Sequence, residues 1–170
     1  MSRNALLVLL GAQALACAPT VVTIHGRSVD HAIGGDVREV EPGHWAGTYK
    51  NAGLNIDHVG DKDEEVLACT ETGTFDGVWL SATEIKSCTS QGTRDCRAKD
   101  GSTNTGESTA TCRVGPNGEL IFEGTGKQVN ATGRFEGSQA TFTFTAWQVV
   151  PPPGVINFGS YTTTVTLPKK

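Results

Sequence analysis

The chain contains five cysteines, an odd number, and four of them lie in its central part: Cys69, Cys88, Cys96 and Cys112. In an exported protein such thiols form disulfides rather than acting as nucleophiles. Four cysteines allow three pairings, and the sequence alone does not choose between them. A turn at Gln91-Gly92 favours a bond between Cys88 and Cys96 within a loop, which leaves Cys69 and Cys112 for a bridge between strands.

The fifth cysteine, Cys17, follows a segment with the layout of a signal peptide. Residues 1–16 carry one cation, Arg3, and then an apolar run that is too short to span a bilayer as a helix. Ala14-Leu15-Ala16 is a small-x-small cleavage site, and with Cys17 it resembles the lipobox of bacterial lipoproteins. We expect an extracytoplasmic protein, either a lipid-anchored bacterial envelope lipoprotein or a secreted one. The odd cysteine favours the anchor at Cys17, which would be the only membrane attachment.

Acid or base catalysis would need a carboxylate inside an apolar cavity, where burial raises its pKa. Glu84 and Glu107 are the candidates, and Glu84 has the same strand parity as Val78 and Leu80. A carboxylate at a strand end more often reaches solvent, however, so catalytic residues stay unassigned.

Metal, phosphate and nucleic-acid sites have little support. The histidines lack His-x-His or Glu-x-x-His spacing, and the acidic run from Asp57 to Glu65 lacks the glutamate that completes a calcium loop. Gly124-x-Gly126-Lys127 lacks the spacing and the hydroxyl residue of a phosphate-binding loop. The net charge of −4 disfavours nucleic acid. We expect no metal, no cofactor and no nucleic-acid partner.

Alternation of residues with a period of two dominates the chain from His44 onward and predicts β-strands. Phe142, Phe144 and Ala146 share one face of their strand, and Tyr161, Val165 and Leu167 share one face of the last strand. Glycine and threonine, which suit turns and strands, account for 21 and 22 of the 170 residues. The expected strands are 44–50, 65–75, 77–87, 107–114, 119–123, 131–135, 139–150 and 160–167.

Connecting segments complete the expected organisation. Gly115-Pro116-Asn117-Gly118 predicts a hairpin turn, whereas Ser87 to Gly106 is so polar that a long loop with a disulfide staple is expected. Residues 17–42 are expected to be a tether, an irregular segment or a loosely attached first strand, and the β domain is expected to span 43–170. About eight antiparallel strands without helices form either a closed barrel or a sandwich.

Two glycine-rich pieces favour the barrel: Glu123-Gly124-Thr125-Gly126-Lys127 and Ala131-Thr132-Gly133-Arg134-Phe135-Glu136-Gly137. Together they resemble a stretch of the allene oxide cyclase and dirigent β-barrel superfamily, including its bacterial relatives. The resemblance covers about fifteen residues and implies a glycine-rich turn and bulge between two strands of an eight-stranded barrel. Glu123, Gln128 and Val129 depart from the family pattern. Its catalytic carboxylates and ligand contacts have no matching positions here, so no activity is carried over.

In an eight-stranded barrel the inward side chains either fill the interior or leave room for one small ligand. Six Phe, three Trp and two Tyr are few, so we expect an underfilled apolar pocket with Phe142 and Phe144 in its wall and Trp79 and Glu84 at its mouth. Trp147 would then face outward. The sequence thus predicts a non-catalytic envelope barrel that binds a small apolar molecule or a protein partner. A barrel isomerase or cyclase and a β-sandwich interaction module are the alternatives.

If Cys17 is acylated, its replacement should change where the protein is found in the cell. A Cys17→Ser variant is expected to move from the membrane fraction to the soluble one, because serine offers no thiol for lipid and stable anchoring needs more than one acyl chain. Cell fractionation, with the intact mass of the mature protein, measures this. Unchanged partitioning of the variant, together with a lipid-free native mass, would indicate simple secretion.

Overall fold

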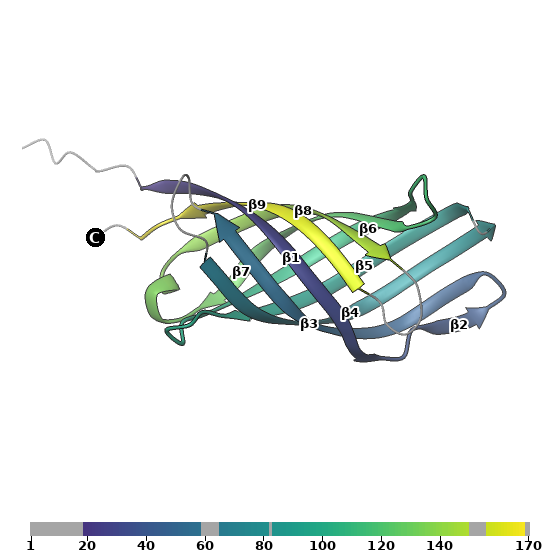
Figure 1. Cartoon of the computed structure of the whole chain (residues 1–170), viewed down its shortest axis with the longest axis horizontal. Helices are drawn as coiled ribbons and strands as arrows, with labels where there is room; N and C mark the ends of the chain where they lie inside the picture. The colour runs from purple at the N-terminus through teal and green to yellow at the C-terminus, as the bar shows by residue number, and fades with distance from the viewer. Residues whose placement is uncertain (1–18, 59–64, 82, 150–155, 169–170) are drawn as a thin grey trace, which may run out of the picture.

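The computed structural model of this chain describes residues 19–58, 65–81, 83–149 and 156–168 (Figure 1). Nearly all of them belong to β-strands, and the described part holds one short 3-10 helix and no helix long and apolar enough to cross a membrane. The expected signal peptide over 1–16, Cys17 and the prolines at 151–153 lie outside the described residues. The all-β class is confirmed.

The strands follow one another in an antiparallel order that closes on itself. β1 pairs with β9 on one side and with β3 on the other, so β1 and β3 to β9 form the expected eight-stranded barrel rather than a sandwich. β2 pairs with the start of β3 as an additional strand. The elements are β1 Val21–Gly35, β2 Arg38–Glu41, β3 His44–His58, β4 Glu65–Ser81, β5 Glu84–Arg97, β6 Thr103–Val114, β7 Leu120–Ala131, η1 Gly133–Phe135, β8 Gln139–Val149 and β9 Ile156–Thr166.

The two ends of the barrel differ, and we name them by the elements that they carry. The η1 end holds the 3-10 helix, the start of β1 and the end of β9 (Figure 1). The β2 end is formed by the β2–β3 and β4–β5 hairpins, which project beyond the neighbouring strands.

The N-terminal part of the barrel corrects one expectation. Residues 17–42 were expected to be a tether, an irregular segment or at most a loosely attached first strand, but Val21–Gly35 forms β1, a full barrel strand paired on both sides. Its pairing with β9 extends from Val21 to His31, and its pairing with β3 extends from His25 to Gly35. Without β1, both β3 and β9 would be left with an unpaired edge. The barrel therefore starts at β1 and not at His44.

The segment from 87 to 106 is the second correction, because β5 and the start of β6 replace the expected long loop. β5 looks like a loop in sequence because it is polar on both faces: its inward positions include Ser90, Gly92 and Arg94, and its outward positions carry Thr and Asp. The expected strand 77–87 is also divided, since β4 ends at Ser81 and β5 begins at Glu84.

Around the glycine-rich stretch the expected turn is replaced by continuous strand. β7 runs from Leu120 to Ala131, and Gly124 and Gly126 lie in its middle; the irregularity in its pairing with β6 falls later, at Val129. The expected strand 131–135 is instead the end of β7 followed by η1. The hairpin turn before β7 is confirmed, with Gly118 at φ 82° and its N–H donating to the carbonyl of Gly115.

Two disulfides are present in the described part of the chain, as expected, but both predicted pairings are wrong. Cys69 bonds to Cys96, its direct cross-strand neighbour on β5, with a Cα–Cα distance of 4.1 Å. Cys88 bonds to Cys112 on β6, with a Cα–Cα distance of 5.2 Å. Because Cys88 and Cys96 lie on one extended strand, they cannot approach each other as they would across a turn. The two bonds instead cross-link β5 to the strand on either side.

Inward aromatic side chains lie opposite glycines on the neighbouring strand. Phe142 and Phe144 on β8 pair with Gly126 and Gly124 on β7, Tyr49 pairs with Gly73, and Tyr161 pairs with Gly26. A Cβ added at any of these glycines would overlap the facing ring or hydroxyl. The glycines let each ring lie across its neighbouring strand, which is how the barrel accommodates large rings without filling its centre.

This packing predicts the effect of a methyl group at Gly126. A Gly126→Ala variant is expected to lose about 1–3 kcal/mol of unfolding free energy in urea, because the new Cβ would overlap the ring of Phe142 and the backbone carbonyl oxygen of Glu107. Gly34→Ala is the control, since the nearest atom to its added Cβ would be Cβ of Lys50 at 3.9 Å. In a Phe142→Ala background the cost at Gly126 should fall but not disappear, because the added Cβ would still overlap the backbone carbonyl oxygen of Glu107. An equal cost with and without the ring would contradict this account.

Candidate functional site

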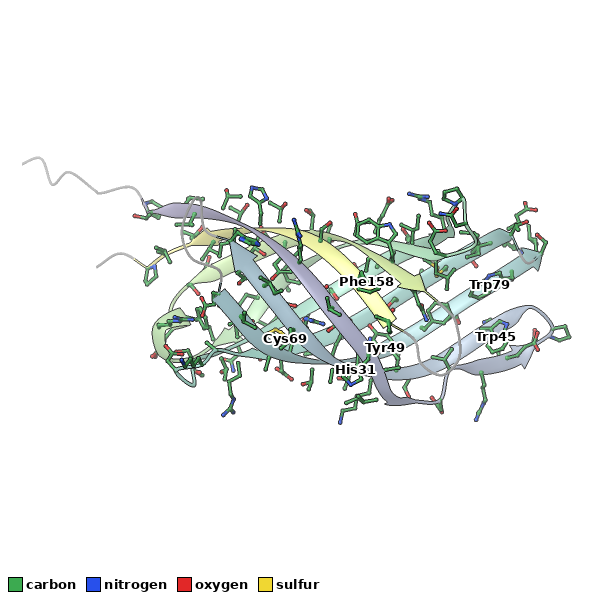
Figure 2. All side chains as sticks on the ribbon, in the orientation of Figure 1. His31, Trp45, Tyr49, Cys69, Trp79 and Phe158 are labelled. Carbon is green, nitrogen blue, oxygen red and sulfur yellow. A yellow bond between two sulfur atoms is a disulfide. The ribbon has the colours of Figure 1, made fainter. Side chains whose placement is uncertain are left out.

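The inward side chains leave a cavity of about 1080 Å³ along the barrel. This volume lies just above the usual range for small-molecule sites, roughly 300–1,000 Å³. Towards the η1 end the lining includes Leu67 and Phe135, which pack around the Cys69–Cys96 disulfide. Towards the β2 end it includes Trp45 and Trp79 (Figure 2). Trp45 is 41% exposed, so the lining reaches the surface at this end, which we call the mouth; Leu167, in the lining at the η1 end, is exposed to a similar extent, 39%.

One wall of the cavity is aromatic and comes mainly from β7 and β8. The Phe142 and Phe144 rings lie 6.3 Å apart between centroids, and Phe122 continues the row towards the mouth. Phe75 on β4 meets Phe122 edge-on at 6.4 Å and Trp79 at 5.9 Å. The aromatic surface thus extends from the centre of the barrel to its mouth, and it suits a flat or aliphatic apolar body.

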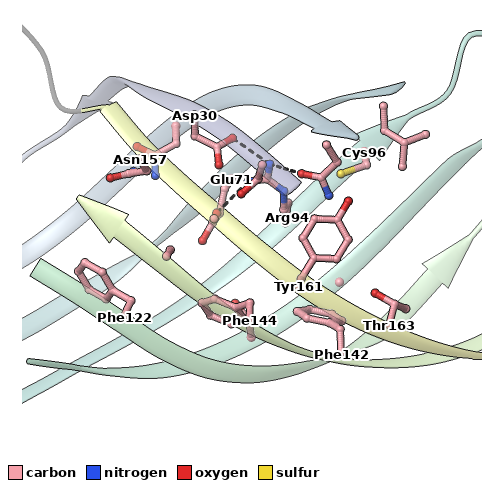
Figure 3. Close-up of a pocket in the computed structure, with 18 of the residues that line it drawn as sticks. Asp30, Glu71, Arg94, Cys96, Phe122, Phe142, Phe144, Asn157, Tyr161 and Thr163 are labelled. Carbon is pink, nitrogen blue, oxygen red and sulfur yellow. Dashed lines mark hydrogen bonds and ion pairs between the residues drawn. The ribbon is translucent and has the colours of Figure 1, made fainter. Parts of the chain in front are cut away.

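The opposite wall is polar and is organised by Arg94 on β5 (Figure 3). Its Nη2 donates to Oδ1 of Asp30 at 2.8 Å and to Oδ1 of Asn55 at 2.6 Å, and its Nη1 donates to Oε2 of Glu71 at 3.1 Å. Burial acts to lower the pKa of Arg94, but the two carboxylates outweigh it and hold that pKa above its ordinary value. The guanidinium stays charged and joins β1, β3, β4 and β5 across the lumen.

Tyr49 extends this polar wall towards the middle of β5. Its hydroxyl donates to Oε1 of Glu71 at 2.9 Å and lies 3.2 Å from Oγ of Ser90. Gly73 and Gly92 leave the space through which the ring crosses β4. Burial, reinforced by the charge of Glu71, raises the pKa of Tyr49, so the phenol remains a neutral donor.

Tyr161 also crosses a neighbouring strand and hydrogen-bonds to a carboxylate, that of Asp57. Tyr161 on β9 crosses β1 at Gly26, and its hydroxyl donates to Oδ1 of Asp57 on β3. Burial raises the pKa of Asp57, while the Tyr161 hydrogen bond and the charge of His58 act to lower it. The pKa of Tyr161 is also raised, first by burial and then by Asp57. Asp57 is thus a carboxylate inside the cavity whose charged form is disfavoured by its surroundings.

The structure brings together three of the four residues expected at a ligand site. Phe142, Phe144 and Trp79 line the cavity, and Trp79 lies near the mouth. Glu84 does not: it is exposed at the start of β5, and Leu80, whose face it was expected to share, is 60% exposed. Glu107, the other candidate carboxylate, is exposed on β6. Both glutamates therefore point away from the lumen.

Sequence reasoning missed the polar wall. Asp30 lay in the expected tether and Arg94 in the expected loop, so neither was assigned to a strand. The signal that could have found them is the alternation Ser90, Gly92, Arg94, Cys96, which has the period of a strand with small or polar inward residues.

Among the described residues no group of three or more His, Cys, Asp or Glu side chains is placed to hold a metal ion. Part of the acidic run between Asp57 and Glu65 lies outside the described residues. Trp147 faces outward as expected and is 36% exposed beside Phe158. Comparison with models of protein families and with curated proteins finds no match to this chain.

The Arg94 cluster predicts that replacing Arg94 lowers the unfolding free energy far more than replacing the exposed Arg113. Arg94→Met is expected to lower the unfolding free energy by about 3 kcal/mol, because it leaves the carboxylates of Asp30 and Glu71 buried without their cation. Arg113→Met breaks an exposed pair with Glu123 and should cost less than about 1 kcal/mol.

Urea unfolding at neutral pH measures both arginine variants. Equal losses in the two variants would contradict the assigned role of Arg94.

Proposed function

We propose that this protein is an exported β-barrel that binds a small, largely apolar molecule inside its lumen without converting it. The observation that carries the proposal is the cavity of about 1080 Å³ with an aromatic wall. A side-chain-filled barrel needs no such space, and empty apolar volume costs stability unless something occupies it. The ligand's apolar part would lie along Phe122, Phe142 and Phe144, and a polar group would face Arg94 and its partners.

Export is supported by the two disulfides, which are typical of oxidising compartments. We propose that residues 1–16 are removed as a signal peptide and that Cys17 is acylated. Cys17 precedes β1 by four positions, and β1 starts at the η1 end. An anchor at Cys17 would therefore keep the η1 end close to the membrane and leave the mouth at Trp45 and Trp79 facing away from it.

A barrel isomerase or cyclase is the second candidate, and Asp57 is the observation that favours it. A carboxyl group with a raised pKa, placed in a cavity beside the hydroxyl of Tyr161, is suited to take up and return a proton. The two candidates differ in the state of the ligand: a binder releases it unchanged, and an isomerase releases it rearranged. Loss of such rearrangement in Asp57→Asn would identify the enzyme.

A protein partner, the other expected occupant, would need an outer surface. Four exposed apolar residues form one row of cross-strand neighbours on the outside of the barrel: Leu54, Val29, Phe158 and Trp147. Threonines such as Thr143 and Thr162 cover the same strands nearer the η1 end. This row is an open surface, whereas the lumen encloses a small molecule. We therefore place the main function inside the lumen.

Binding in the lumen is tested with N-phenylnaphthylamine, a neutral apolar dye that fluoresces in apolar surroundings. The folded protein is expected to give a saturable rise in fluorescence. Ser108→Trp, at an inward position of β6, should weaken binding at least about tenfold because the indole occupies the cavity. Thr109→Trp places the same ring on the exposed outer face and should leave binding unchanged.

Circular dichroism would show that both tryptophan variants are folded. A folded native protein that does not bind the dye, or one whose binding is weakened equally by the two variants, would overturn the lumen as the site.

A further inference from the structure

The charges that line the cavity do not balance. Among the residues that the structure describes, four carboxylates and two guanidinium groups belong to the lining: Asp30, Asp57, Glu65 and Glu71, with Arg94 and Arg134. At the η1 end Glu65 and Arg134 form an ion pair and offset each other. In the centre Arg94 is shared by two carboxylates, so this cluster keeps one net negative charge.

Asp57 adds a further acidic group to the centre of the lumen, on β3 two positions from Asn55 of the Arg94 cluster. The hydroxyl bonded to it comes from Tyr161, a neutral side chain that supplies no compensating charge, and His58, the next residue along β3, favours the ionised form only as an imidazolium. The tyrosine hydroxyl stabilises the ionised carboxylate, but burial works against it. A cation entering the cavity would relieve this conflict, because an opposite charge nearby favours the ionised form.

The aromatic wall favours the same kind of ligand. Phe142 and Phe144 lie across the lumen from the Arg94 cluster (Figure 3). The face of an aromatic ring carries negative electrostatic potential and attracts ammonium groups, most strongly where water is excluded. A cation in the centre would therefore have rings on one side and carboxylates on the other. An anion would meet the acidic surplus.

We propose that the ligand is a hydrophobic organic cation, an amine or quaternary ammonium on an apolar body, whose charge lies between Asp57 and the Phe142–Phe144 rings. This inference rests on the proposed function, since it names the class of molecule that the lumen takes. The apolar body extends along Phe122 towards the mouth at Trp79, and the cluster around Arg94 bounds the site on the polar side.

Three probes with the same naphthalene body and different charges test the inference: naphthylmethylamine, naphthylmethanol and naphthoic acid. Each is measured by displacement of N-phenylnaphthylamine from the full chain near neutral pH. We expect the amine to bind about tenfold more tightly than the alcohol, and the acid to bind most weakly. In Asp57→Asn the ratio of amine to alcohol affinity should fall several-fold, while the affinity for the alcohol stays within about twofold.

Glu107→Gln is the matched control, because it removes one carboxylate from the exposed outer face of β6 and should not change the ratio. Glu71→Gln is a second test inside the lumen and should also lower the ratio, provided that circular dichroism shows the native fold. Equal binding of amine and alcohol, or a ratio that Asp57→Asn leaves unchanged, would overturn the cation while leaving the lumen as a binding site. Absence of any binding, including that of the dye, would instead overturn the proposed function itself.

Discussion

The pairing of each large inward ring with a cross-strand glycine is the constraint on which the interior of this barrel depends. Eight strands enclose a space that ordinary side chains can fill. Here four inward rings each lie over a glycine of the next strand, so the rings lie against the barrel wall and do not fill its centre; they belong to Phe142, Phe144, Tyr49 and Tyr161. The lumen stays open as a result, and its two walls can have different chemistry.

The pairing of a ring with a cross-strand glycine also positions the polar groups. Tyr49 and Tyr161 cross a neighbouring strand where a glycine leaves room, and each ends with its hydroxyl on a carboxylate. Their hydroxyls satisfy Glu71 and Asp57 without adding positive charge. Arg94, the cation at the centre, is already held by two carboxylates. A buried network of this kind costs desolvation energy, and it is tolerable because its members are hydrogen-bonded to one another.

The disulfides support β5, the strand that carries Arg94. Cys96 ties one end of β5 to β4, and Cys88 ties the other end to β6, next to the Thr89–Thr111 pair at which the β5–β6 pairing begins. β5 has small inward residues such as Ser90 and Gly92, which contribute little packing of their own. Covalent links to both neighbours hold the strand, and thereby the guanidinium, in register.

The sequence by itself determined the all-β class, the hairpin at Gly115–Gly118, the number of disulfides and the inward direction of Phe142 and Phe144. All of these follow from the period of side-chain alternation, local turn chemistry or cysteine arithmetic, which act over a few residues. Only the tertiary structure decided that β1 closes the barrel, how the four cysteines pair and where the charges gather. Asp30, Glu71 and Arg94 come from β1, β4 and β5 and are up to 64 positions apart, so no local pattern links them. A strand that is polar on both faces is recognised only when its partner strands show which face encloses the lumen.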